Sequence, residues 1–253
     1  MSGRKDREER REQRLRQESE AEVQARRQRL LKLGSAVAFL AIVGVVVAIV
    51  VSQNQGGGGG KPKDAGQVDR ALAGIPQNGL VLGKPGAKVT LYEFGDLQCP
   101  VCKAYSEEIV PDVIASKVRS GAADLEFRNF TIIGPESVPA GAAAIAAGKQ
   151  GRGWNYLEVF YRNQGTESSG YVTDSFMTEI AKAAGVPDIA RWNRDRKSKA
   201  IVSEVERTTA EARRIGFEGT PSFAVKGPGT TGMESLGTPQ SAGAIEAAID
   251  KAG

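Results

Sequence analysis

The chain has 253 residues, with 34 Lys or Arg, 30 Asp or Glu, two Cys and no His. The lack of histidine excludes Ser-His-Asp, Cys-His and His-metal chemistry, and two cysteines are too few for a tetrahedral zinc site within one chain. The net charge of +4 comes entirely from residues 1–32, which carry 11 basic and 7 acidic residues. The overall charge therefore gives no reason to expect nucleic-acid binding, and we predict none.

The first segment, residues 1–33, is dense in Arg, Glu and Gln, with several acidic residues placed four positions before a basic one. This pattern predicts a solvated cytoplasmic helix or a disordered tail. Binding of anionic lipid headgroups or of an acidic partner remains an alternative for the same charges.

The next segment, residues 34–52, predicts a single transmembrane helix. Gly34 to Val51 is a run of 18 uncharged, mostly apolar residues, which is long enough to span a bilayer. A buried core helix and a cleaved signal peptide are the alternatives, but the basic region is long and no small-residue cleavage site follows. We therefore predict a retained signal anchor with a cytoplasmic N-terminus, because the basic residues precede the span.

Residues 53–78 contain the glycine run Gly56–Gly60 and few apolar residues, so we predict a flexible linker. From residue 79 to 253 the composition is that of a globular domain. Its patterns predict strands at 80–82, 88–94, 124–133, 221–225 and 232–236. They predict helices at 100–119, 138–148, 154–163, 174–184, 187–196, 198–216 and 241–252.

Both cysteines of the chain lie in one motif, Cys99-Pro100-Val101-Cys102, where a predicted strand meets a predicted helix. The start of a helix offers unpaired N–H groups and the positive end of the helix dipole, and both favour a thiolate. Pro100 suits the first helical turn. A cysteine of low pKa with a second cysteine three residues later can form and exchange a disulfide.

Two stretches carry a resemblance to a known family. They are Tyr92-Glu93-Phe94-Gly95-Asp96-Leu97-Gln98-Cys99-Pro100-Val101-Cys102 and Gly219-Thr220-Pro221-Ser222-Phe223. With a helical region between them, they resemble the DsbA-like branch of the thioredoxin superfamily in its membrane-anchored form. The resemblance implies an α/β thioredoxin-like fold with an inserted helical subdomain at about 136–216, preceded by the transmembrane helix.

The resemblance also implies roles for individual residues. Cys99 would be the attacking thiol and Cys102 the resolving thiol, and their disulfide would be the redox-active group, with no other cofactor and no metal. Glu93 matches the buried acid of the family, although a strand carboxylate turned to solvent is the alternative. Thr220 and Pro221 match the substrate-binding cis-proline loop, and an edge or turn proline is the alternative there.

Val101 occupies a position where the most oxidising family members carry His, so we expect a less oxidising couple here. The predicted function is extracytoplasmic protein disulfide oxidation. The implied partners are unfolded or cysteine-containing extracytoplasmic proteins, a quinone-linked membrane re-oxidase of the DsbB or VKOR type, and the bilayer through residues 34–52. A reductase or isomerase, or a non-catalytic thioredoxin-fold binding module or holdase, remains an alternative.

Overall fold

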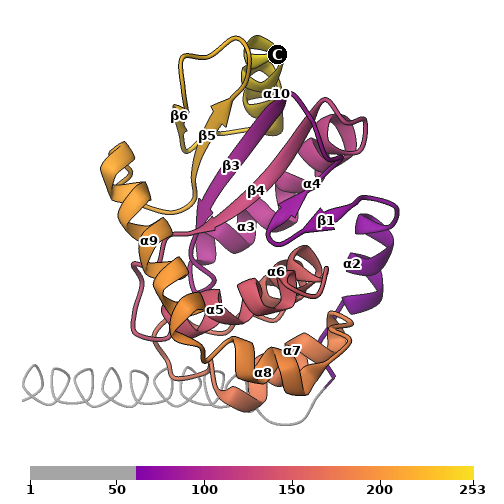
Figure 1. Ribbon diagram of the computed structural model, residues 1–253, viewed down its shortest axis with the longest axis vertical. Helices are drawn as coiled ribbons and strands as arrows, with labels where there is room; N and C mark the ends of the chain where they lie inside the picture. Colours follow the sequence, from indigo (N-terminus) through magenta and orange to yellow (C-terminus); the bar gives the residue numbers. More distant parts are fainter. Residues whose placement is uncertain (1–60) are drawn as a thin grey trace, which may run out of the picture. The chain divides into compact units, whose positions relative to one another are not determined.

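A computed structural model describes residues 61–253, and Figure 1 shows their arrangement around one mixed β-sheet. The sheet has six strands in the order β1-β2-β4-β3-β5-β6. Only β3 and β4 pair in parallel, and the other neighbours are antiparallel. The strands are β1 (Gln77–Asn78), β2 (Val81–Leu82), β3 (Val89–Gly95), β4 (Ala123–Asn129), β5 (Ser222–Lys226) and β6 (Glu234–Gly237). The predicted α/β thioredoxin-like fold with inserted helices is confirmed.

The side chains of the central strand β3 contribute to two hydrophobic clusters. Leu91 lies in the main hydrophobic core, whereas Tyr92 and Phe94 belong to a smaller cluster with Phe217. Because side chains alternate along a strand, Glu93 points to the same side as Leu91. This places Glu93 toward the main core.

The helix predicted over 100–119 is interrupted. The structure has α3 (Pro100–Glu108), α4 (Val110–Val113) and a π-helical turn at Ile114–Val118. Pro111 explains the break, because a proline has no N–H to donate to the carbonyl four residues earlier. The helix α3, which carries the cysteine motif, is therefore a separate short helix.

Five helices form the insertion between β4 and β5: α5 (Ser137–Gly148), α6 (Gly153–Arg162), α7 (Asp174–Ala183), α8 (Ile189–Asp195) and α9 (Lys199–Ile215). A last helix, α10 (Ala242–Ala252), packs against α4, β3 and β5. In the basic segment around α8, Trp192 is fully buried and its indole N–H donates to Ala143 O at 2.9 Å. This tryptophan is a core residue and presents no face to a nucleic-acid base.

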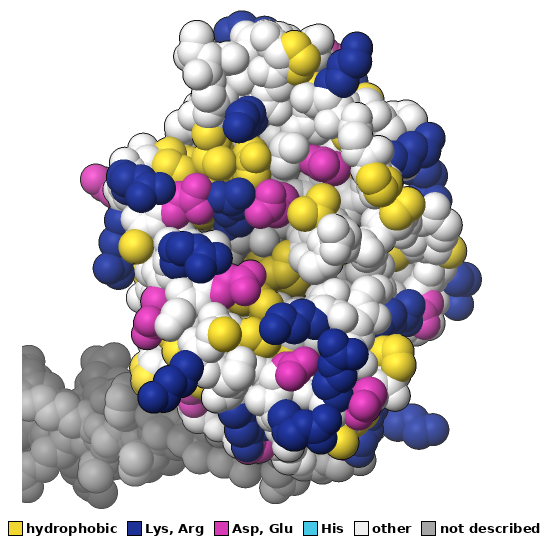
Figure 2. Space-filling view, viewed as in Figure 1, with side chains coloured by type: hydrophobic (Ala, Val, Ile, Leu, Met, Phe, Trp, Pro, Cys, Tyr) yellow, Lys and Arg dark blue, Asp and Glu magenta, His cyan; other side chains and the backbone are white. Residues whose placement is uncertain are grey.

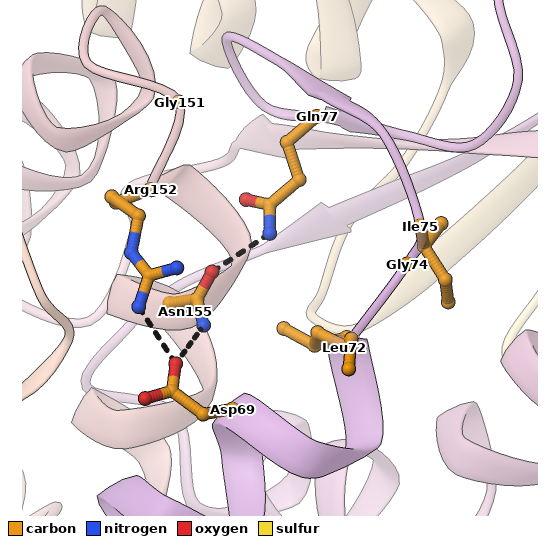
Figure 3. A pocket seen from close by; sticks show the side chains of 9 residues that line it. Asp69, Leu72, Gly74, Ile75, Gln77, Gly151, Arg152 and Asn155 are labelled. Carbon is orange, nitrogen blue, oxygen red and sulfur yellow. Dashed lines mark hydrogen bonds and ion pairs between the residues drawn. The ribbon is translucent and has the colours of Figure 1, made fainter.

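Part of the predicted linker is folded. Ala65–Leu72 forms the helix α2, which buries Val68 and Leu72 in the main core. Asn155 on α6 donates to Asp69 at 2.8 Å, and Figure 3 shows this contact beside Arg152, which also pairs with Asp69. The globular domain therefore begins before residue 79, because α2 packs against α6.

The predicted tail (1–33), the membrane span (34–52) and the first part of the linker (53–60) lie outside the described residues. Within residues 61–253, no helix is both long and apolar enough to cross a membrane.

Candidate active site

The two cysteines lie at the junction between β3 and α3. β3 ends at Gly95, a four-residue loop follows, and Cys99 is the N-cap residue of α3 with Pro100 as its first helical residue. Gly95 is required by close packing, since a Cβ there would lie 2.6 Å from the Phe127 ring and 3.2 Å from the Tyr161 hydroxyl. The strand can thus run close beneath the inserted helices before the chain turns into the motif.

Asp96 holds the loop that carries the cysteines. Its side chain is fully buried, and one carboxylate oxygen accepts the Gln98 N–H at 2.9 Å. The other oxygen accepts the N–H groups of Ile132 and Ile133 at 2.8 and 3.0 Å. Asp96 therefore joins the loop before Cys99 to the loop after β4.

Two glutamine side chains connect the same loop to the helical insertion. The Gln164 amide donates to Leu97 O at 2.8 Å and to Cys99 O at 3.1 Å. Gln98 is fully buried, donates to Ser137 Oγ at 3.0 Å and accepts the Ser168 N–H at 3.0 Å. The insertion thus fixes the backbone on which the first thiol is carried.

The Cys99 thiol is the more acidic of the pair. Hydrogen bonding from the Cys102 thiol is the main cause that lowers the pKa of Cys99 to about 6, with smaller contributions from Thr220 and from the Cys102 and Val101 amides, against the opposing effect of burial. The Cys102 N–H lies 3.4 Å from the Cys99 sulfur. A thiolate at neutral pH is the form that reacts in exchange.

Cys102 has the opposite character. It is fully buried, and burial raises the pKa of its thiol well above its usual range. Glu93 is 2 % exposed, and burial, followed by the charge of Glu158, raises the pKa of its carboxyl to about 8. The expectation of a buried acid is confirmed over the alternative of a solvent-facing one, and the charge of Glu93 is among the causes that raise the pKa of Cys102.

The Thr220–Pro221 peptide bond is cis, as the resemblance predicted. This loop lies against the motif, because the Cys99 thiol donates to Thr220 O at 3.4 Å. Thr238 Oγ1 donates to Pro221 O at 2.9 Å, which ties the loop to the segment after β6. The structure thus brings both sequence motifs together, although 121 positions separate Cys99 from Thr220.

Two exposed apolar side chains lie in the motif or close to the loop before it. Val101 (48 % exposed) and Ile132 (37 %) are the exposed large hydrophobic residues of the part of the chain that the structure describes. The hollow in Figure 3 is lined by Asp69, Asn155 and neighbouring residues and contains neither cysteine. The face in Figure 2 carries interspersed basic and acidic side chains, without a field of one sign.

Four residues of this region were given no role in the predictions from sequence: Gln98 and Gln164, which hold the loop, and Ser106 and Glu158, which meet beneath α3. The one signal in the sequence is a carboxylate, Glu158, inside the aromatic run Trp154–Tyr161. A charged residue in such a run suggests a buried, partnered group.

Comparisons with known proteins agree with this arrangement. A family model described as Thioredoxin matches residues 76–251. A probable disulfide bond formation protein D of Bacillus cereus is 31 % identical over 150 residues, which cover 58 % of this chain and 69 % of the relative. Disulfide bond formation protein D of Bacillus subtilis is 28 % identical over 165 residues, covering 63 % and 73 % of the two chains.

Among solved structures, oxidised BdbD from Bacillus subtilis superposes with a TM-score of 0.61 at 24 % identity. The match covers 70 % of this chain and 95 % of that structure. This likeness concerns the fold.

Proposed function

This chain belongs to the thioredoxin superfamily as a DsbA-like thiol–disulfide oxidoreductase of disulfide bond formation, and we propose that Cys99 and Cys102 are its redox centre. The observation that carries this assignment is the placement of the two thiols: Cys99 caps α3 and lies 3.4 Å from the Cys102 N–H, whereas Cys102 is fully buried. This placement agrees with a lowered pKa for Cys99 and a raised pKa for Cys102. The centre needs no bound cofactor, because the disulfide itself carries the two electrons.

In the oxidised protein, a substrate thiolate attacks the Cys99 sulfur. A bond forms between the substrate sulfur and Cys99, the Cys99–Cys102 bond breaks, and Cys102 leaves with the electron pair. A second substrate thiolate then displaces Cys99, which leaves as a stable thiolate. The substrate gains a disulfide and the protein ends in the dithiol form.

Glu93 supplies the proton that Cys102 needs. A buried thiolate at Cys102 is unfavourable, because burial raises its pKa. The Glu93 carboxyl, which holds a proton up to a pH of about 8, gives it to the departing sulfur and regains it when the pair is re-oxidised.

The cis-proline loop holds the substrate backbone beside Cys99. Its support is the contact between the Cys99 thiol and Thr220 O, together with the exposed apolar side chains of Val101 and Ile132 next to the motif. Extended, unfolded segments that contain a cysteine suit such an open surface better than a small molecule would.

We place this reaction outside the cytoplasm, on proteins that have been translocated. The support is the apolar run at 34–52 with basic residues before it, and the oxidising conditions that disulfide formation requires. A quinone-linked membrane protein of the DsbB or VKOR type would re-oxidise the dithiol.

Substrate trapping tests the assignment of the two thiols. In the full chain, Cys102→Ser retains Cys99 but cannot complete resolution, so mixed disulfides with reduced, unfolded protein should accumulate and be visible on non-reducing gels. Cys99→Ser should form none. Full oxidase activity in Cys99→Ser would exclude the proposed centre and favour a non-catalytic binding role.

The direction of transfer is tested by equilibrium with glutathione, with free thiols counted by alkylation and mass. A potential above about −200 mV is expected for an oxidase, whereas a value near −270 mV would indicate a reductase.

A further inference from the structure

A second carboxyl group lies buried beneath the active-site helix. Glu158 on α6 is 6 % exposed, and its Oε1 accepts a hydrogen bond of 3.0 Å from Ser106 Oγ. Its Oε2 lies 3.4 Å from Arg162 Nη2, one turn further along α6. Ser106 follows Cys102 by four residues, so the hydroxyl that holds Glu158 and the second thiol lie on one face of α3.

The backbone brings Glu93 to the same space. Glu93 and Gly95 point to the same side of β3, because side chains alternate along a strand. A Cβ at Gly95 would lie 3.2 Å from the Tyr161 hydroxyl, which comes from α6. Tyr161 follows Glu158 by three residues, so both extend from the same face of α6. β3, α3 and α6 thus enclose one buried space that contains both carboxyl groups.

The charge of Glu158 affects the protonation of Glu93. Burial and then Glu158 raise the pKa of Glu93 to about 8. Burial raises the pKa of Glu158 to about 7, with Arg162 and Ser106 acting to lower it and Glu107 on α3 acting to raise it. The two carboxyl groups share one buried space, so a negative charge on Glu158 opposes the release of the proton from Glu93.

We propose that Glu158 is a positioning residue for disulfide exchange: held by Ser106 and Arg162, its carboxylate makes Glu93 retain the proton that the departing Cys102 sulfur requires. Glu158 contacts no reacting sulfur and acts only through Glu93, so this inference rests on the role given to Glu93 in the proposed function. When the disulfide is broken, Cys102 takes the electron pair and the Glu93 proton. On re-oxidation, Cys102 returns that proton to the Glu93 carboxylate before it attacks.

The pH profile of the Cys102 step tests this proposal in the full chain. The reduced protein is mixed with excess oxidised glutathione, so that attack by Cys102 on the Cys99–glutathione mixed disulfide limits the rate. Wild type should show an inflection near pH 8, where Glu93 ionises. Glu158→Gln keeps the shape but removes the charge, so the inflection should fall by about one pH unit. Glu108→Gln, an exposed carboxyl of α3, is the matched control and should leave it unchanged.

The variant Glu93→Gln distinguishes a failure of the proton transfer by Glu93 from a failure of the role given to Glu158. If Glu93→Gln retains the inflection, the proton transfer in the proposed function is wrong and this inference fails with it. If Glu93→Gln abolishes the inflection while Glu158→Gln leaves it at the wild-type pH, only the role of Glu158 is overturned.

Should Glu158→Gln not fold, Ser106→Ala is used instead. Loss of its hydrogen bond makes Glu158 hold its proton longer, so the inflection should again move to lower pH, and an unchanged profile contradicts the proposal.

Discussion

At the scale of single residues, the proposed exchange depends on the different surroundings of two identical thiols. Cys99 is at the N-cap of α3, where the Cys102 N–H points to its sulfur. Cys102 is one turn into the helix, fully buried and close to the ionisable Glu93. The Cys99 sulfur is thereby suited to act as nucleophile and as leaving group, whereas the Cys102 sulfur is protonated in the reduced protein.

We expect the side chain at position 101 to influence how strongly the cysteine pair oxidises. The Val101 side chain is 48 % exposed beside Cys99 and carries no charge. In Val101→His, a protonated imidazole would stabilise the Cys99 thiolate and therefore the reduced form. We expect the pKa of Cys99 to fall below about 6. A decrease of one unit corresponds to about 1.4 kcal/mol and to a potential that is more oxidising by about 30 mV.

The measurements are the pH dependence of iodoacetamide alkylation and the equilibrium with glutathione. Val101→Leu, which changes shape without adding a charge, serves as the control and should keep both values. A potential that does not move in Val101→His would show that the second middle position has no electrostatic influence in this chain.

At the scale of the helices and strands, the loop 96–99 is held from outside its own segment. Gln164, which follows α6, donates both amide hydrogens to carbonyl groups of this loop. In Gln164→Ala these two bonds are lost, so we expect the free energy of unfolding of the oxidised protein to fall by about 1–3 kcal/mol. Urea denaturation measures this change. Gln240→Ala, whose amide bonds only the nearby Thr238 O at the surface, should cost little, and equal losses in both variants would contradict the role of Gln164.

The same scale shows which features could be predicted from the sequence. The strand at 89–95, the helix that starts at Pro100 and the helical insertion follow from hydrophobic periodicity, and the cysteine motif identifies the site. The break at Pro111 is also a local effect, although the longer apolar pattern hid it. The burial of Glu158 against α3 depends on tertiary packing, which its local sequence does not specify. The packing of Ala65–Leu72 against α6 is likewise a contact between distant segments of the chain.

At the scale of the whole molecule, the site is assembled from three distant parts of the chain. The segment 93–102 carries the thiols and the acid, residues 158–168 cover and hold it, and the 219–221 loop faces the first thiol. The helical insertion is therefore part of the candidate active site and not only an addition to the fold. Its own position in turn depends on the elements that pack against it, including α2.

The attachment of α2 to α6 can be tested through Asp69. As Figure 3 shows, one oxygen of this carboxylate accepts hydrogen bonds from the side chains of Asn155 and Arg152. Asn155 is 2 % exposed. Asp69→Ala leaves the buried Asn155 amide without its acceptor, so the free energy of unfolding should fall by about 1–2 kcal/mol, measured by urea denaturation. The redox potential should not change, because Asp69 contacts neither thiol. Arg70→Ala, an exposed position of the same helix, is the control. If Asp69→Ala were as stable as wild type, the contacts of Asp69 with Asn155 and Arg152 would contribute nothing to the attachment of α2, which would then depend on its apolar residues alone.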